Sequence, residues 1–330
     1  MATSLYKTYI IPLLVYGLES LVLQEKEIQT LEAYHRRNLR HMLHLPASTA
    51  TPAIYLLSGC PPLEAEIHVR TLLFFRSIAE GRGQEGPLDF VNSVIERQLA
   101  LKGMDSSSWT AWVRRILLHY GLPNAFDVLR HPPEKTYWRK MVRSTIYQHW
   151  TDLLLSQKEQ MSSLAYLKST GLRVGLLHQS LTGTETPVAI QKVAVATKLI
   201  TGRYPLANNR TAGKRFSNRC PLCEEEEEDQ THFLLHCRNL SQARKCFIFK
   251  ILQYCRENKI DIEPVNLTAL IIDPVGNGHP NLKVLVRNMI FSLHNSRCSQ
   301  LHDRESTQRS RSAAISEGQG SPPDVTSTTP

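Results

Sequence analysis

The stretch Cys220-Pro-Leu-Cys223, followed by Glu-Glu-Glu-Glu-Glu-Asp-Gln-Thr and then by His232-Phe-Leu-Leu-His-Cys237, decides the fold of the region around it. The two-residue gap between the first two cysteines lets two thiolates converge on one ion from a tight turn. His232 and Cys237 lie slightly more than one helical turn apart and can complete a tetrahedron. The spacing therefore predicts one structural zinc ion on Cys220, Cys223, His232 and Cys237, with no position open to activate water.

The fourth ligand has one alternative. His236 precedes Cys237, and His232 with His236 forms an i, i+4 pair that could bind the same ion. Three thiolates with one imidazole suit zinc, so we expect Cys237 to be the ligand. A chance cluster of reduced cysteines is the alternative to any metal site.

The charges around these ligands separate into two segments. The chain from Arg203 to Cys223 contains no acid, whereas Glu224 to Asp229 are six consecutive acids. The upstream cations, here called the basic arm, are Arg203, Arg210, Lys214, Arg215 and Arg219. A zinc site with three thiolates is itself anionic, so the acidic run should repel phosphate, and nucleic acid should contact the basic arm. Arg238, Arg244 and Lys245 would form a second edge. Alternatively, the acidic run is a solvated loop that neutralises the arm.

Most of the remaining chain has the three- and four-residue apolar periodicity of helices, which predicts a mainly α fold. The expected helices cover 5–16 with a kink at Pro12, 26–44, 52–57, 63–79, several segments of 88–169, 188–200, 241–258 and 282–294. The short apolar segment 267–272 favours a strand. The tryptophans should anchor the core; they are Trp109, Trp112, Trp138 and Trp150.

Five regions follow from these elements and from the glycines and prolines between them. They are a helical region 1–80, a helical connection region 81–186, the zinc-binding region 187–258, a C-terminal helical segment 259–295 and a tail 296–330. The tail has almost no large apolar residues, so we expect it to be disordered. The role of 88–169 stays open.

The helix expected over 26–44 carries a second basic surface. Arg36, Arg37 and Arg40 recur at three- and four-residue steps on one side, opposite an apolar side. This face either contacts phosphate or is simply solvated.

Composition limits the compartment and the chemistry. The formal charge of +9 fits a polyanionic partner. The cysteines number seven, and the four outside the metal segment are scattered, which indicates a reducing compartment, nuclear or cytoplasmic. The N-terminal apolar run is too short to span a membrane. No phosphate loop, nucleophile elbow or zinc-protease motif occurs. We therefore expect no enzyme activity and no small-molecule substrate.

Two separated runs carry a resemblance to a known family. The first is Leu5-Tyr-Lys-Thr-Tyr-Ile-Ile-Pro-Leu-Leu-Val-Tyr-Gly-Leu-Glu19 with Leu31-Glu-Ala-Tyr-His-Arg-Arg-Asn-Leu-Arg40 and His44-Leu-Pro46. It resembles the region that follows the catalytic palm in LINE-type, non-LTR retrotransposon reverse transcriptases. The second run is Leu199-Ile-Thr-Gly202, Tyr204-Pro-Leu, Asn209-Arg, the cysteine pair, the acids and Thr231 to Cys237. It resembles the zinc-binding segment of the same proteins.

The resemblance implies a thumb-like region over 1–80 and a CCHC zinc knuckle that helps to hold template RNA or target DNA. In that family the metal-binding aspartates of the palm lie upstream of the point that corresponds to Met1. The expected function is thus a non-catalytic, zinc-stabilised, nucleic-acid-binding remnant of a reverse transcriptase. The alternatives are a zinc-stapled protein-interaction scaffold, or a fragment of a complete RNA-directed DNA polymerase whose palm is encoded upstream. The choice between RNA and DNA and the oligomeric state stay open.

Overall fold

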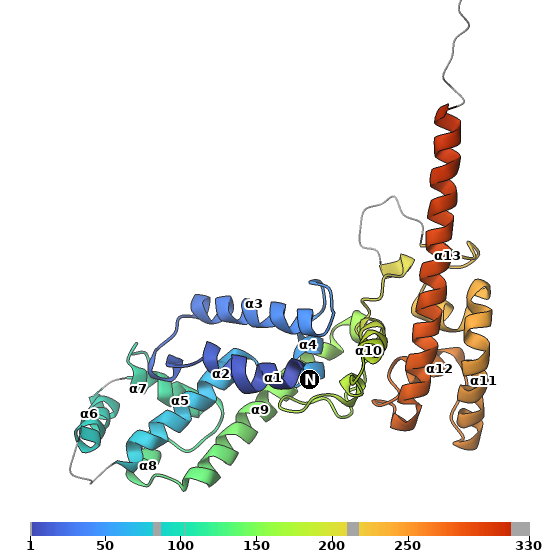
Figure 1. Ribbon diagram of the computed structural model, residues 1–330. Helices are drawn as coiled ribbons and strands as arrows, with labels where there is room; N and C mark the ends of the chain where they lie inside the picture. The colour runs from blue at the N-terminus through green and yellow to red at the C-terminus, as the bar shows by residue number, and fades with distance from the viewer. Residues whose placement is uncertain (1, 82–86, 102, 210–217, 318–330) are drawn as a thin grey trace, which may run out of the picture. The chain divides into compact units, whose positions relative to one another are not determined.

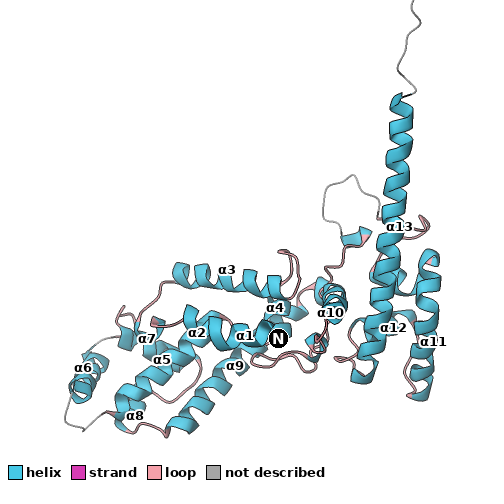
Figure 2. Cartoon of the chain, in the orientation of Figure 1, coloured by secondary structure: helices cyan, strands magenta, loops and turns pink. Residues whose placement is uncertain are grey.

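The computed structural model describes the chain except for residues 1, 82–86, 102, 210–217 and 318–330. Over the described residues the fold is mainly α, as the sequence predicts, with thirteen α-helices and no named strand (Figures 1 and 2). The chain divides into two compact units, Met1–Arg203 with Ile272–Asn281, and Tyr204–Ile271 with Leu282–Pro330. The finer division into five regions stays a prediction.

The first unit begins with an irregular helical segment around Pro12. The short helices α1 (Ala2–Leu5) and α2 (Ile11–Leu14) are joined by a π-helical turn over Tyr6–Ile10. Proline has no backbone N–H to donate, and its ring clashes with the carbonyl four residues earlier. The wider π-helical turn directly before Pro12 relieves that clash. The kink predicted at Pro12 is therefore present as this turn.

Helix α5 (Leu63–Glu80) is the centre of the first unit. It packs against α3 (Glu25–Met42), α7 (Trp109–His119), α8 (Ala125–Arg130) and α9 (Lys135–Glu159). Trp138 is fully buried, and its indole Nε1 donates to the carbonyl of Leu72 at 3.0 Å. Trp112 is also buried, whereas Trp109 and Trp150 are half-buried.

Three further helices complete this unit, and the first of them is buried along almost its whole length. They are α4 (Thr51–Ser58), α6 (Pro87–Leu101) and α10 (Pro187–Ile200). Gly59 ends α4 with a φ of +59°, and a Cβ there would lie 2.0 Å from the carbonyl oxygen of Leu176. Only glycine fits at this position, where the backbone of the segment 173–178 packs against the end of α4.

Two polar side chains of α3 are buried in the core. Glu32 accepts hydrogen bonds from the Tyr55 hydroxyl and from the backbone N–H of Glu64, and burial raises the pKa of its carboxyl. His35 is fully buried, with Nδ1 2.9 Å from the Tyr6 hydroxyl and Nε2 3.1 Å from the carbonyl of Pro61. A carbonyl only accepts, so Nε2 carries the proton and the tyrosine donates to Nδ1. This part of the helix therefore serves packing.

In the second unit α11 (Ser241–Glu257), α12 (Pro264–Ile272) and α13 (Lys283–Glu317) pack beside the metal segment. The predicted strand over 267–272 is wrong, because these residues belong to α12. Pro264 begins the helix, where its fixed φ and missing N–H cost nothing. Leu267, Leu270 and Ile271 then fall at helical spacing on one buried face.

Helix α13 extends well beyond the predicted end at His294 and reaches Glu317 (Figure 1). The first of the extra turns carry side chains that contact the metal segment, among them Arg297 and Arg304. Residues 318–330 of the predicted tail lie outside the described residues.

The buried imidazoles of the first unit should make the free energy of unfolding decrease at acidic pH. Burial lowers the pKa of both His35 and His68 to about 4. Because an unfolded histidine titrates near 6.5, the folded state resists protonation. The stabilising contribution is complete above about pH 6.5 and is lost as the pH falls towards 4, on the order of 3 kcal/mol for each histidine.

Denaturant unfolding at a series of pH values measures this loss. The double variant His35→Gln/His68→Gln should be less stable at pH 7 but show a flatter pH dependence between 6.5 and 5. Comparison at equal metal content separates this effect from acid release of a bound ion. Parallel pH curves for the two proteins would refute the assignment.

Candidate metal centre and basic surfaces

Four buried side chains of the second unit converge as the sequence predicts. The ligand atoms of Cys220, Cys223, His232 and Cys237 all lie within 4.8 Å of one another. The first two sit on a tight turn, closed by the N–H of Glu224 donating to the carbonyl of Cys220 at 2.8 Å. His236 is exposed and is not among the converging side chains.

A π-helical turn over His232–His236 places the second pair of ligands. The N–H of Cys237 donates to the carbonyl of His232 at 2.8 Å, a five-residue step that brings both side chains to one side. Asp229 begins the turn, since its carboxylate accepts the N–H of His232 at 2.7 Å.

The distances fit a tetrahedral ion. Cys220 Sγ and Cys237 Sγ are 3.8 Å apart, and Cys223 Sγ is 3.4 Å from His232 Nε2. A tetrahedron with metal–sulfur bonds of about 2.3 Å has a sulfur–sulfur edge of about 3.8 Å. The cluster can therefore hold one metal ion with four protein ligands.

The surrounding groups orient these ligands. His232 Nδ1 lies 2.8 Å from a carboxylate oxygen of Glu226, so Nδ1 carries the proton and Nε2 faces the cluster. Arg244 Nη2 donates to the carbonyl of Cys237 at 2.9 Å. Contact with Cys237, and then burial, raises the pKa of Cys220 to about 12, while the same contact lowers that of Cys237. A cation that binds both sulfurs as thiolates must displace the proton they share, so its affinity rises with pH.

One acid of the acidic run is buried in the fold, while the other five are exposed. Glu228 is 1% exposed and forms a bidentate pair with Arg297, at 2.7 Å to Nε and 2.9 Å to Nη2. The N–H of Ala207 donates to the same carboxylate at 2.8 Å. Glu225 pairs with Arg238 at 2.5 Å, and Glu224 pairs with Arg304 at 2.8 Å. The sequence does not reveal these pairings, because two of the three pairs join residues 69 and 80 positions apart in the chain.

The predicted second basic edge is wrong at Arg244. This residue is buried, and its guanidinium serves the carbonyl of Cys237. Arg238 is paired with Glu225, and of the three residues of the predicted edge only Lys245 is exposed and without an ion pair to the described residues. The edge therefore offers little free positive charge.

The basic arm is described only at its ends. Arg203 is half-buried, and Arg219 is exposed and bridged through its backbone to Glu227. Arg210, Lys214 and Arg215 lie outside the described residues. The arm as a phosphate-contacting surface stays a prediction.

The basic face of α3 is smaller than expected. Arg40 donates to the carbonyl of Thr49 from Nε at 3.3 Å and from Nη2 at 3.0 Å, which fixes the turn after the helix. Arg37 is exposed, with its guanidinium 5.7 Å from the centre of the Tyr34 ring. Arg36 is half-buried. Of the three arginines, Arg37 is the one that solvent reaches most freely.

Sequence reasoning missed a cationic groove on the first unit, within the region 88–169 that had no assigned role. Arg139, Lys140 and Arg143 of α9 face Arg173 across a groove of about 560 Å³. The signal was present as cations at three- and four-residue steps in a helix. Arg173 could not be added, because its proximity depends on the fold.

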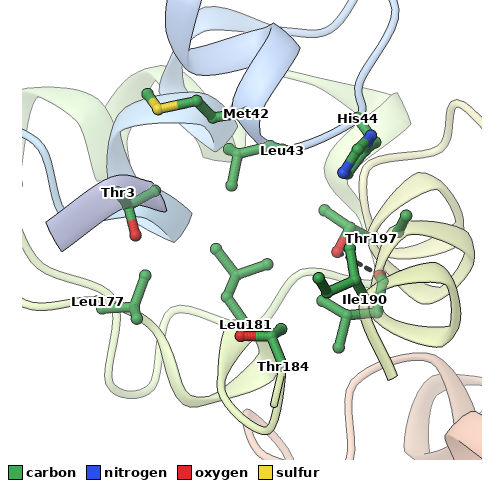
Figure 3. A pocket seen from close by; sticks show the side chains of 11 residues that line it. Thr3, Met42, Leu43, His44, Leu177, Leu181, Thr184, Ile190 and Thr197 are labelled. Atoms are coloured by element: carbon green, nitrogen blue, oxygen red, sulfur yellow. Dashed lines mark hydrogen bonds between the residues drawn. The ribbon is translucent and has the colours of Figure 1, made fainter. Parts of the chain in front are cut away.

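An apolar pocket of about 170 Å³ lies elsewhere in the first unit (Figure 3). Leu43 and His44 at the end of α3 face Leu181 and Ile190 there. A cavity of about 150 Å³ lined by apolar residues can bind benzene, so this pocket can accommodate one small apolar group. His44 is its one ionisable side chain. The pocket therefore lacks the charges that phosphate needs.

No protein-family model, no curated protein and no solved structure matches this chain. Among the residues that the structure describes, no helix combines the length and the apolar character needed to cross a bilayer.

The Glu228–Arg297 pair supplies a stability test. Arg297→Met leaves the buried Glu228 carboxylate unpaired, which should cost about 3 to 5 kcal/mol. Arg238→Met, which breaks the exposed pair with Glu225, is the matched control and should cost about 1 kcal/mol or less.

All four tryptophans lie in the first unit. Chemical unfolding of Arg297→Met should therefore shift the far-UV circular dichroism transition but not the tryptophan fluorescence transition. Equal small effects of both substitutions would show that the buried pair does not hold the second unit together.

Proposed function

We propose that this chain is a zinc-stabilised, non-catalytic nucleic-acid-binding module, related to the C-terminal part of a LINE-type reverse transcriptase. The observation that carries the proposal is the buried cluster of three cysteines and one histidine. A site with four protein ligands leaves no position for substrate or activated water, so its ion serves the fold. In this proposal, nucleic acid binds to surfaces of the fold that the metal ion stabilises, and not to the ion itself.

Zinc is the ion that suits the cluster best. Three thiolates and one imidazole in a tetrahedron match its preferences, and hard cations such as Mg²⁺ prefer oxygen ligands. Zinc would be held by Cys220, Cys223, His232 and Cys237, and it would supply a cross-link between the turn at Cys220 and the π-helical turn at His232.

Nucleic acid is supported as the partner by the net charge of +9 and by the pairing of the acidic run. Glu224, Glu225 and Glu228 are matched by arginines of the same unit. This pairing weakens the repulsion that six neighbouring acids would exert on phosphate. The basic arm adds five cations to this part of the sequence.

A protein-interaction scaffold is the second candidate, favoured by exposed apolar side chains near the N-terminus. Leu13 is 74% exposed and Tyr16 is 80% exposed, and Leu5 and Tyr9 are also exposed. Such a surface is typical of a protein contact. The same surface is compatible with a longer polymerase in which a further domain covers it. Retention on heparin at about 0.3 M salt favours the nucleic-acid module, and failure to bind at about 0.05 M favours the scaffold.

The metal centre predicts distinct effects of neighbouring residues. The purified protein should contain about one zinc ion per chain, and Cys223→Ser and Cys237→Ser should each lose it. His236→Ala is the matched control and should retain it, because this side chain lies outside the cluster. Elemental analysis with far-UV circular dichroism measures both metal and folding. Loss of zinc in His236→Ala and retention in Cys237→Ser would make His236 the fourth ligand.

The basic arm predicts a change in salt dependence. Lys214→Ala/Arg215→Ala should weaken binding to oligonucleotides and reduce the slope of log K against log salt by about 1.4 to 1.8. The control Lys250→Ala/Arg256→Ala removes two exposed cations of α11 and should leave affinity and slope nearly unchanged. Equal slopes for the arm variant and the wild type would remove the arm from the binding surface.

A further inference from the structure

The cationic groove of the first unit runs along one side of α9. Side chains at positions 136, 139, 140, 143, 144, 147, 148 and 151 line one wall, and the segment 173–176 forms the other. These positions recur at three- and four-residue steps, so they share one side of the helix. At 1.5 Å per residue the wall is about 22 Å long, which suits an extended ligand better than a single small anion.

No acid lines this groove, whereas Arg139, Lys140, Arg143 and Arg173 do. Within the described part of the chain, the side chains of Arg139, Lys140 and Arg173 form no ion pair or hydrogen bond, and all three are exposed. Their charges are therefore available to a ligand.

The neighbouring acids are already engaged. Glu66 lies beneath the groove, where its carboxylate accepts the Tyr147 hydroxyl at 3.1 Å and approaches Arg143 at 3.9 Å and Arg70 at 3.6 Å. Glu134 caps the start of α9, and Asp152 accepts a hydrogen bond from Gln148 at 2.8 Å. The groove thus keeps a net positive charge.

The walls of the groove are held in place without a ligand. Thr151 Oγ1 accepts the N–H of Val174 at 3.1 Å, and the N–H of Gly175 donates to the carbonyl of Gly59 at 2.9 Å. Gly175 has a φ of +95°, and a Cβ there would lie 3.0 Å from the Tyr147 ring. The glycine backbone therefore packs directly on this ring. A site that is already ordered loses little entropy when it binds.

The mixture of side chains favours a phosphodiester strand. Three of the four cations are arginines, whose planar fork matches phosphate oxygens, and the hydroxyls of Thr136 and Ser144 lie along the same wall. Val174 and Leu176 add apolar surface opposite the Tyr147 ring. Unpaired bases and sugars need such surface beside a cationic track, whereas a duplex shields its bases.

We propose that this groove binds the backbone of single-stranded nucleic acid. The proposal rests on the proposed function for its class of ligand, but it assigns a separate surface in a different unit from the basic arm.

The test measures binding of fluorescein-labelled oligo(dT) and oligo(U) to the full-length, zinc-loaded protein by anisotropy at several KCl concentrations. Arg139→Ala/Lys140→Ala/Arg173→Ala should bind roughly 10- to 100-fold more weakly, with a salt slope reduced by about 2. Arg143 is left intact because it also contacts Glu66. The control Lys26→Ala/Arg97→Ala/Lys250→Ala removes three exposed cations from other helices and should behave as the wild type.

The outcomes separate the two proposals. If the wild type binds and the groove variant matches it in affinity and slope, the groove proposal fails while the proposed function stands. If the wild type binds neither oligonucleotide at low salt, the proposed function fails, and the groove proposal fails with it. Groove-dependent binding of polyglutamate but not of oligonucleotides would identify an acidic peptide site and overturn the nucleic-acid assignment.

Photocross-linking gives a second measurement that does not depend on substitution. An oligonucleotide that contains 4-thiouridine should cross-link to peptides from α9 or from the segment 173–176. Cross-links confined to the second unit would contradict the groove proposal and support the basic arm alone.

Discussion

The buried ion pair between Glu228 and Arg297 is the interaction on which the second unit depends. It joins the acidic run between the two pairs of metal ligands to a helix nearly seventy residues later in the chain. Burial of either charge alone would be costly, so each requires the other. The pair also explains why α13 continues past His294, because Arg297, Gln300 and Arg304 use its additional turns to contact the metal segment. The metal cluster and the last helix are therefore parts of one structure.

This arrangement changes where binding is to be sought. The acids beside the cluster are structural partners, Arg244 supports a ligand backbone, and Arg40 supports a turn. A charged residue in the sequence is thus not always available at the surface to bind a ligand. Within the described first unit, Arg139, Lys140 and Arg173 are exposed cations without an ion-pair partner, and they line one groove. The metal-binding cluster lies in the second unit and the cationic groove in the first, so the two features are separate surfaces of the chain.

Much of the fold was predictable because the periodicity of apolar residues over a few positions predicts helices. The ranges of α3, α5, α10 and α11 agree with the sequence to within a few residues. The segment 267–272 was not predictable in the same way, since a short apolar run suits a strand or a buried helix equally. The continuation of α13 as far as Arg304 was missed because its polar turns there are held by distant contacts rather than by an apolar stripe.

The sequence by itself determined the mainly α class and the identity of the four converging side chains. Both follow from spacing over a few residues, which local geometry converts directly into structure. Only the tertiary structure decided which charges are free. It placed Glu228 against Arg297, and it brought Arg173 to the groove beside Arg139 and Lys140. Such juxtapositions depend on how the helices pack, and no local pattern records the distance between residues far apart in the chain.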